Sequence, residues 1–329
     1  SSISIDGNVY TLGLTLTGTP DGSETLTVVP SGATAIYDAV ANAASTTQSN
    51  NTVSLNDQTA PTMVISSTTV ASGATTNDAT IAMKFTSSES TTNLIAGDIT
   101  VTNGSIGALS GSGEVYTATL TPDASGAVTV KISAGAYSDA AGNTNTVSNT
   151  FSWTYDGTAP TVNSVTSTNS NGTYISGEQI TVQVVFSEAV VVTGTPTITL
   201  DTGGSGDVVN YTTGSGSNYL DFTYTIGTGD ISSDLDYTST GALALNGGTI
   251  KDVNGNDATL TLASPGASNS LADSKNIIID TALPTITGTT IAGNNSTIAV
   301  TFSEAVYDTD GGSGALEVGD FALSIAGGT

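Results

Sequence analysis

The chain has 329 residues, no Cys, no His and 4 Lys+Arg against 29 Asp+Glu, which gives a formal net charge of −25. Without Cys or His, disulfide bonds and thiol or imidazole chemistry are excluded, and so is nucleic-acid binding, because almost no side chain could neutralise phosphates. No apolar run is long enough to cross a bilayer, so we expect no membrane insertion by this segment, and the first residues do not resemble a signal peptide.

A five-residue joint recurs three times along the chain, as Asp57-Gln-Thr-Ala-Pro61, Asp156-Gly-Thr-Ala-Pro160 and Asp280-Thr-Ala-Leu-Pro284. Each copy lies between β-like runs, and proline, which lacks an N–H, marks the start or edge of a strand. The copies are about 100 and about 120 residues apart, the size of small β-sandwiches. We therefore predict four parts: a head segment (1–56) that is the C-terminal half of a module, a first module (57–155), a second module with longer loops (156–279), and a tail segment (280–329) that is the N-terminal half of a module.

The head segment carries strand patterns only. Apolar residues alternate with polar ones over Tyr10–Leu16, which predicts a half-buried strand. A second strand follows the turn Thr19–Gly22, and a third lies near Val53 and Leu55. The run Ile36–Ala44 is the best helical candidate in the chain, and it is short.

The first module has the clearest alternation. Ile81, Met83 and Phe85 point one way and Lys84 points the other, as expected of a strand with one face in a core. Similar rows predict strands over Tyr116–Leu120, Val128–Ile132 and Phe151–Tyr155, and Trp153 is expected in the core.

The second module and the tail repeat this plan. Alternating rows predict strands at Ile180–Phe186 and Leu220–Ile226, Gly-rich turns lie at 203–206 and 214–216, and Ile277–Ile279 closes the module. In the tail, Ile298–Phe302 matches the strand that ends at Phe186, and both continue as Phe-Ser-Glu-Ala-Val. We expect closing strands like those of residues 1–56 to complete the tail, either from further along a longer array or from a neighbouring chain.

Three features recur in the modules: the opening Asp, a Phe-Ser-Glu-like strand end, and a late turn of the type Asp-Ala-Ala-Gly-Asn. The turns are Asp139–Asn143, Asp252–Asn256 and the drifted copy Asp38–Asn42, which has Val40 and Ala41 in place of Ala-Gly and is expected to differ in shape. Such internal repetition indicates an array of similar modules.

These residues resemble the bacterial immunoglobulin-like tandem repeats of large cell-surface adhesins and biofilm-associated proteins. The resemblance implies an all-β fold of immunoglobulin-like β-sandwiches joined end to end as a rod. It also implies a non-catalytic stalk or filament on the extracellular bacterial surface, used in attachment or gliding motility, whose partners are neighbouring repeats of the same polypeptide. Many such repeats hold Ca²⁺ between modules.

The topology of a seven-stranded sandwich predicts where the recurring acids meet. The start of the first strand, the B–C loop and the F–G loop share one pole, and the Phe-Ser-Glu end is expected to begin the B–C loop. Several carboxylates at one pole would repel one another and provide the hard oxygen ligands that Ca²⁺ prefers. The predicted structural Ca²⁺ ligands are Asp57, Glu89, Asp98, Asp139 and Asn143 in the first module; Asp156, Glu188, Asp252, Asn254 and Asn256 in the second; Asp280, Glu304 and Asp320 in the tail; and Asp38 and Asn42 in the head.

Other functions have weaker signals. A carboxylate pair could hydrolyse glycosides, and Asp230, Asp234 and Asp236 are close in sequence, but solvated loop acids are the simpler interpretation, so we expect no enzyme. A glycan- or protein-binding role would use the long loops 201–218 and 227–250, where Tyr211 and Tyr237 are the aromatic residues. A surface-layer component is a further alternative. The sequence does not indicate the surface ligand.

Overall fold

The computed structural model describes residues 2–91, 93–309 and 312–327. Their secondary structure is almost entirely β, and the α-helix among them is the single turn α1 (Leu271–Ser274). The chain forms two compact units, residues 1–158 with 254–256 and residues 159–253 with 257–329. None of the described helices is both long and apolar enough to span a membrane.

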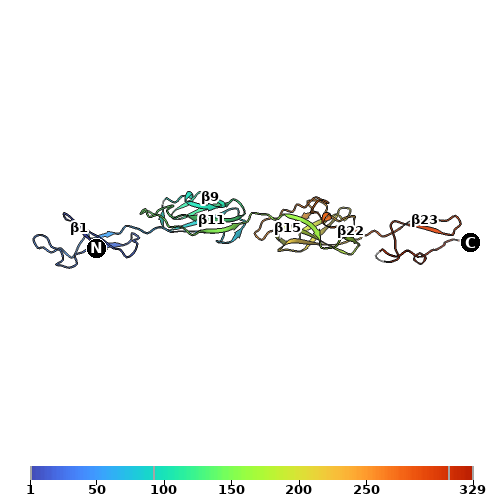
Figure 1. The fold of residues 1–329 in the computed structure, drawn as a ribbon, viewed down its shortest axis with the longest axis horizontal. Coiled ribbons are helices and arrows are strands. Elements are labelled where there is room, and N and C mark those ends of the chain that lie inside the picture. Colours follow the sequence, from blue (N-terminus) through green and yellow to red (C-terminus); the bar gives the residue numbers. More distant parts are fainter. Residues whose placement is uncertain (1, 92, 310–311, 328–329) are drawn as a thin grey trace. The chain divides into compact units, whose positions relative to one another are not determined.

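The first module is a sandwich of two four-stranded sheets, seen with β9 and β11 in its two layers in Figure 1. One sheet has the order β5-β7-β10-β9 and the other β6-β12-β11-β8. These orders correspond to the A-B-E-D and C-F-G arrangements of immunoglobulin-like domains, with a short extra strand beside the last one. The bounds are β5 (Met63–Ser67), β6 (Thr75–Thr76), β7 (Ile81–Thr91), β8 (Ile99–Thr102), β9 (Gly104–Ile106), β10 (Ser110–Pro122), β11 (Gly126–Ile132) and β12 (Phe151–Tyr155).

The core of this module follows the predicted period of two. Ile81, Met83 and Phe85 of β7 are buried, whereas Lys84 between them is exposed. Trp153 is buried in β12, as predicted, with its ring 5.9 Å from that of Phe151. Alternating burial on both sheets therefore creates one thin apolar layer, which is the main source of stability in such a sandwich.

The predicted strand ends need correction. We expected the Phe-Ser-Glu motif to begin the B–C loop, but β7 continues to Thr91, so Glu89 lies within the strand. The reason is an irregularity in the β7–β10 ladder, whose register shifts between Gly113 and Val115, after which Gly113 pairs with Thr91. A bulge of this kind bends a strand and lets it continue.

The second module is built around β15 (Gln179–Thr193), which also runs past its predicted end and carries Glu188 within the strand. The larger sheet has the order β13-β15-β18-β17-β16-β20, with β21 also paired to β15, and the smaller sheet has the order β14-β22-β19. Its buried residues include the predicted row from Ile180 to Phe186. The other bounds are β13 (Val162–Ser167), β14 (Gly172–Tyr174), β16 (Thr197–Leu200), β17 (Asp207–Thr213), β18 (Ser217–Thr225), β19 (Ile231–Ser232), β20 (Leu243–Ala244), β21 (Thr249–Lys251) and β22 (Ile277–Asp280).

The head and tail contain isolated hairpins. The head has β1 (Ile3–Asp6) paired with β2 (Val9–Leu12), and β3 (Thr25–Thr27) paired with β4 (Thr52–Ser54). The tail has β23 (Ile286–Ile291) paired with β24 (Ile298–Phe302). The half-buried strand predicted over Tyr10–Leu16 is wrong, because β2 ends at Leu12 and its apolar side chains are exposed. The run Ile36–Ala44 forms a turn closed by a Tyr37–Ala43 bridge rather than a helix.

Candidate metal centre

Three carboxylates meet at one pole of the first module. One oxygen from each of Asp57, Glu89 and Asp139 lies within 4.8 Å of the others. Asp57 precedes β5, Glu89 lies near the end of β7, and Asp139 lies in the loop between β11 and β12. Because the first strand starts, the second ends and the F–G loop turns at the same pole, the sandwich topology brings these three positions together. We call them the acidic group.

Asp139 is fixed by its own turn. One carboxylate oxygen accepts the backbone N–H groups of Gly142 (2.7 Å) and Asn143 (2.8 Å). The other accepts the side-chain amide of Asn143 at 2.9 Å. The turn closes with Gly142 at φ +97°, a left-handed conformation that glycine adopts without strain. Asp139 is therefore only 7% exposed and cannot move away from its acidic neighbours without breaking the turn.

Asn143 connects this turn to the joint. Its side-chain amide also donates to the backbone carbonyl of Asp57, at 3.3 Å. The carboxylate of Asp57 in turn accepts the N–H of Thr59 at 2.8 Å. The predicted ligand Asn143 thus uses its amide nitrogen to hold the Asp139 carboxylate and the backbone of Asp57 in position.

The pKa shifts in the group have opposite directions. Burial raises the pKa of Glu89, and the charges of Asp57 and Asp139 raise it further. Burial also acts to raise the pKa of Asp139, but the hydrogen bonds from Asn143 and from neighbouring backbone N–H groups outweigh it and lower this pKa overall. Hydrogen-bond donors therefore favour the charged form of Asp139, whereas burial and the neighbouring charges disfavour the charged form of Glu89.

The head contributes an acid that sequence reasoning missed. Asp21 lines a pocket of about 540 Å³ together with Glu89, and its charge also raises the pKa of Glu89. The segment carrying it is bonded to the joint, since the carbonyl of Pro20 accepts the N–H of Gln58 (2.8 Å) and the hydroxyl of Thr59 (3.1 Å). One feature of the sequence could have pointed to Asp21: the Thr-Pro-Asp turn is repeated, at Thr19–Asp21 and again at Thr121–Asp123.

Four other predicted ligands, Asp98, Asp320, Asp38 and Asn42, serve local structure. Asp98 accepts the N–H of Ile95 at 2.8 Å and caps the turn η1 (Ala96–Asp98). Asp320 does the same for Glu317 at 2.7 Å in the turn η2 (Val318–Asp320). Asp38 accepts the backbone N–H and the side-chain amide of Asn42, both at 2.8 Å, and so reproduces the Asp139 turn in the head.

The five ligands predicted in the second module are divided between the two units. Within the first unit, Asp156 accepts the side-chain amide of Asn254 at 2.6 Å through its carboxylate, and that of Asn256 at 3.0 Å through its backbone carbonyl. Within the second unit, Glu188 lies in β15, and Asp252 follows β21 and is buried. That these five residues form a second centre stays a prediction.

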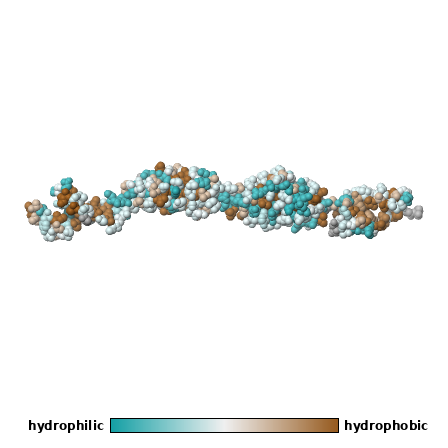
Figure 2. All heavy atoms as spheres, in the orientation of Figure 1, coloured by the Kyte–Doolittle hydropathy of each residue, from teal (hydrophilic) through white to brown (hydrophobic). Residues whose placement is uncertain are grey.

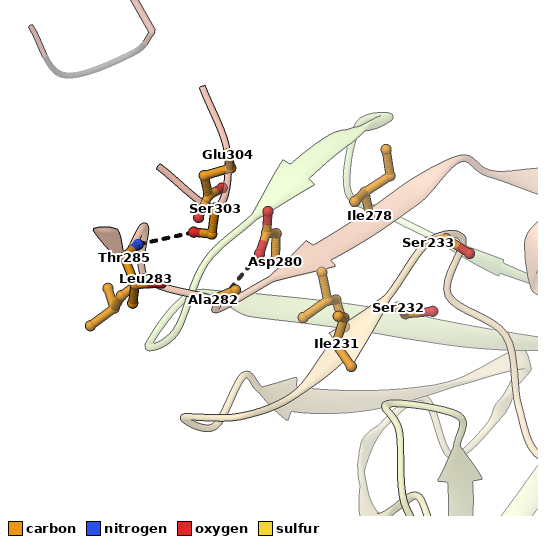
Figure 3. Close-up of a pocket in the computed structure, with 11 residues that line it drawn as sticks. Ile231, Ser232, Ser233, Ile278, Asp280, Ala282, Leu283, Thr285, Ser303 and Glu304 are labelled. Atoms are coloured by element: carbon orange, nitrogen blue, oxygen red, sulfur yellow. Dashed lines mark hydrogen bonds between the residues drawn. The ribbon is translucent and has the colours of Figure 1, made fainter. Parts of the chain in front are cut away.

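Asp280 and Glu304 line one pocket of about 550 Å³ in the second unit, shown in Figure 3. The joint is braced there by two hydrogen bonds, from Ala282 N–H to the Asp280 carboxylate (3.0 Å) and from Thr285 N–H to the Ser303 hydroxyl (2.9 Å). The second bond has counterparts in the modules, from Thr62 to Ser88 and from Thr161 to Ser187. The Ser-Glu pair therefore marks the same structural position in all three repeats.

The alternative sites have structural roles. The Asp230 carboxylate accepts the hydroxyl of Tyr224, and the buried Asp236 carboxylate accepts the N–H of Gly266 at 2.8 Å, so each has its own partner. Tyr237 is buried and donates to the carbonyl of Ala263 at 2.7 Å, and burial, with the charge of Asp236, raises its pKa to about 12. Tyr211 packs edge-on against Phe222. Tyr237 therefore offers no open platform for a sugar, and Tyr211 is half-buried.

Comparison with known families agrees with this fold. Residues 57–155 match the family model of the bacterial Ig-like domain, which confirms the resemblance for this segment. Domains of that family are generally non-enzymatic and typically extracellular or surface-located, so the match indicates at most a structural, adhesin-like repeat. No curated protein matches the chain.

Proposed function

We propose that this chain is a stalk segment of a large bacterial surface adhesin or filament, and that Ca²⁺ bound by the acidic group stiffens the joint before the first module. The observation that carries the proposal is the convergence of Asp57, Glu89 and Asp139 within 4.8 Å. Three carboxylates so close together repel one another unless a cation or protons neutralise them.

The residues present fit a calcium ion. The acidic group provides hard, anionic oxygen ligands, and Ca²⁺ accepts 6–8 oxygens in irregular geometry, with carbonyls and waters completing the set. The donors that hold Asp139 and Asp57 are amide groups, which orient the carboxylates without cancelling their charge. When bound, the ion supplies positive charge and fixed coordination, and no chemical reaction is required of it.

The position of the group explains why binding would stiffen the chain. Asp57 belongs to the segment that joins the head to the first module, whereas Glu89 and Asp139 belong to the sandwich itself. An ion that holds all three therefore ties the joint to a rigid β-scaffold. The same effect serves an adhesin stalk, a motility filament or a surface layer. The glycan-binding alternative has less support, because Tyr237 is buried and the half-buried Tyr211 packs edge-on against Phe222.

The test is a calcium titration of the whole chain, by calorimetry and by thermal unfolding in calcium and in chelator. At calcium about 100-fold above Kd, binding adds about 2.7 kcal/mol to the stability of the module that holds the ion. Asp139→Asn and Glu89→Gln are each expected to abolish calcium binding by the acidic group. The matched control is Asp98→Asn, which alters an acid at the same pole that caps a turn. Binding that survives both group variants, or that is lost equally in the control, would contradict the assignment.

A further inference from the structure

Each joint carries a threonine whose hydroxyl contacts the segment that precedes the joint. The three hydrogen bonds join Thr59 to the carbonyl of Pro20 (3.1 Å), Thr158 to the hydroxyl of Ser125 (2.9 Å) and Thr281 to the carbonyl of Asp230 (2.8 Å). The same chemical group is therefore engaged in all three joints. We call this bond the start contact of the joint.

The partners of these threonines occupy one place in the fold. Ser125 lies in the turn between β10 and β11, which are the E and F strands of the first module. Asp230 lies in the corresponding turn between β18 and β19 of the second module. Pro20 belongs to the Thr-Pro-Asp sequence of the head, and that sequence recurs just before β11. Since the last strand of a sandwich ends at the pole where the E–F turn lies, the topology brings the start of the joint against this turn.

A backbone amide adds to each start contact. In the first two joints the residue before the threonine donates its N–H to the same acceptor, at 2.8 Å from Gln58 and 2.9 Å from Gly157. In the third joint the direction is reversed, because Gly229 of the E–F turn donates its N–H to the hydroxyl of Thr281 at 3.0 Å. Thr281 directly follows the Asp of its joint, one position earlier than in the other copies. The hydroxyl therefore reaches the E–F turn even where its place in the joint motif has shifted.

The other end of each joint is held by the serine of the following Ser-Glu pair. This end contact runs from the N–H of Thr62 to Ser88, of Thr161 to Ser187 and of Thr285 to Ser303, the last of which is drawn in Figure 3. Between the two contacts lie Ala60-Pro61 in the first joint and Ala282-Leu-Pro284 in the third. Because proline fixes φ, these short segments have little freedom of their own.

Hydroxyl contacts are common on such a surface, so their recurrence carries the argument. Figure 2 shows that residues of near-neutral hydropathy make up much of the visible surface, in keeping with a chain rich in Ser, Thr and Gly. In the joints, however, a threonine meets the E–F turn in each of the three copies. The first contact is also a close approach of backbones: Gly22 adopts φ +82°, and a Cβ added there would lie 3.3 Å from the Cβ of Asp57.

We propose that hydroxyl contacts at both ends hold each joint in place without a metal ion, so that bending in the first and third joints is confined to the residues between the contacts. The groups involved are hydroxyls, amides and carbonyls, none of which ionises near neutral pH. The contacts therefore depend neither on calcium nor on moderate changes of pH. A calcium ion bound by Asp57, Glu89 and Asp139 would restrain Ala60-Pro61 a second time, and that consequence alone rests on the proposed function.

The experiment measures amide hydrogen exchange of the 329-residue chain by NMR, in excess chelator and in excess calcium. Thr281→Val removes the hydroxyl and keeps the shape of the side chain, whereas the control Thr281→Ser keeps the hydroxyl. At the second joint Ser125→Ala is the test variant, and Asp123→Asn is the control in the same turn. In chelator we expect exchange about tenfold faster at Gly229 in Thr281→Val and at Gly157 in Ser125→Ala, the effect of losing one hydrogen bond. The controls should exchange like the wild type.

The end contact and the bending segment are tested in the same samples. Ser303→Ala should speed exchange of the Thr285 N–H in the same way, because its acceptor is lost. Nitrogen relaxation should show Thr281 more ordered than Leu283 in the wild type, and Thr281 as mobile as Leu283 in Thr281→Val. Each variant is also a control for the others, since exchange at the unaltered joints shows that the chain remains folded.

Two results would overturn the proposal. One is exchange that stays at the wild-type rate when the acceptor hydroxyl is removed. The other is protection of these amides in the wild type that appears in calcium and is lost in chelator. Calcium affinity of the acidic group should be the same in all of these variants, because none alters its carboxylates. Failure of the hydroxyl contacts would therefore leave the calcium assignment standing, and absence of calcium binding would leave the contacts standing.

Discussion

Single residues of the same type have different roles at the proposed metal centre. Asp139 and Asp98 were both predicted as ligands at one pole, and both accept backbone N–H groups. Asp139 also lies against Asp57 and Glu89, whereas Asp98 only caps a short turn. Hydrogen-bond geometry within a loop, which residue spacing does not reveal, separates the two.

Glu89 gives a test in which the sign of the pH dependence is informative. Its pKa is raised above the ordinary value of 4.5, so the folded module binds this proton more tightly than the unfolded chain does. Stability from this group is therefore present at low pH and is lost as pH rises through the raised pKa. In chelator at pH 7, Glu89→Gln should raise Tm by roughly 2–5 °C. The reason is that it removes the repulsion between Glu89 and its acidic neighbours, which solvent weakens but does not abolish. The gain should vanish near pH 4, where Glu89 is protonated. A gain of equal size at both pH values would contradict this account.

At the scale of the element, the recurring turn depends on one left-handed position. Gly142 occupies it at φ +97° in the first module, and Ala41 occupies it at φ +68° in the head. We expected Val40 and Ala41 to change the shape of the head turn. Instead, the Asp38–Asn42 and Asp139–Asn143 hydrogen bonds are the same. The Asp and Asn side chains therefore hold the turn, and the head accepts the strain of alanine there.

The turn predicts the cost of losing its glycine. A Cβ added at Gly142 would meet no atom within 4 Å, so Gly142→Ala introduces backbone strain and no clash. A left-handed alanine costs about 1–2 kcal/mol, so Tm of the first module should fall by several degrees. Calcium affinity should fall only slightly, because the equivalent Asp38–Asn42 turn in the head forms with alanine at this position. Thermal melts and a calcium titration of this variant check both, and a loss of calcium binding without a loss of stability would be the contrary result.

The strands were predictable wherever one face is buried. Alternation identified the inward rows of β7, β10, β11 and β15, because a period of two is what a half-buried strand requires. The continuation of β7 past Glu89 was not predictable, since it depends on a bulge formed with a strand more than twenty residues away. The half-buried strand predicted in the head was wrong for a related reason. Alternation shows that one face of a strand is apolar, but it does not show whether another segment covers that face.

At the scale of the whole molecule, the sequence indicated the modules and joints more readily than the residues that meet at each joint. The family match confirms the Ig-like nature of residues 57–155, whereas the division into four parts and the rod arrangement stay predictions. Asp21 was missed because it comes from the head, 36 residues before Asp57. Its contribution appears only when the two segments are seen to meet in one unit.

The central claim, that calcium bound by the acidic group stiffens the joint before the first module, is tested most directly by small-angle scattering of the chain in excess calcium and in excess chelator. We predict a larger maximum dimension in calcium, because bound ions restrict bending where Asp57 meets Glu89 and Asp139. Glu89→Gln should remove this response. Scattering profiles that superimpose in calcium and in chelator would contradict the account.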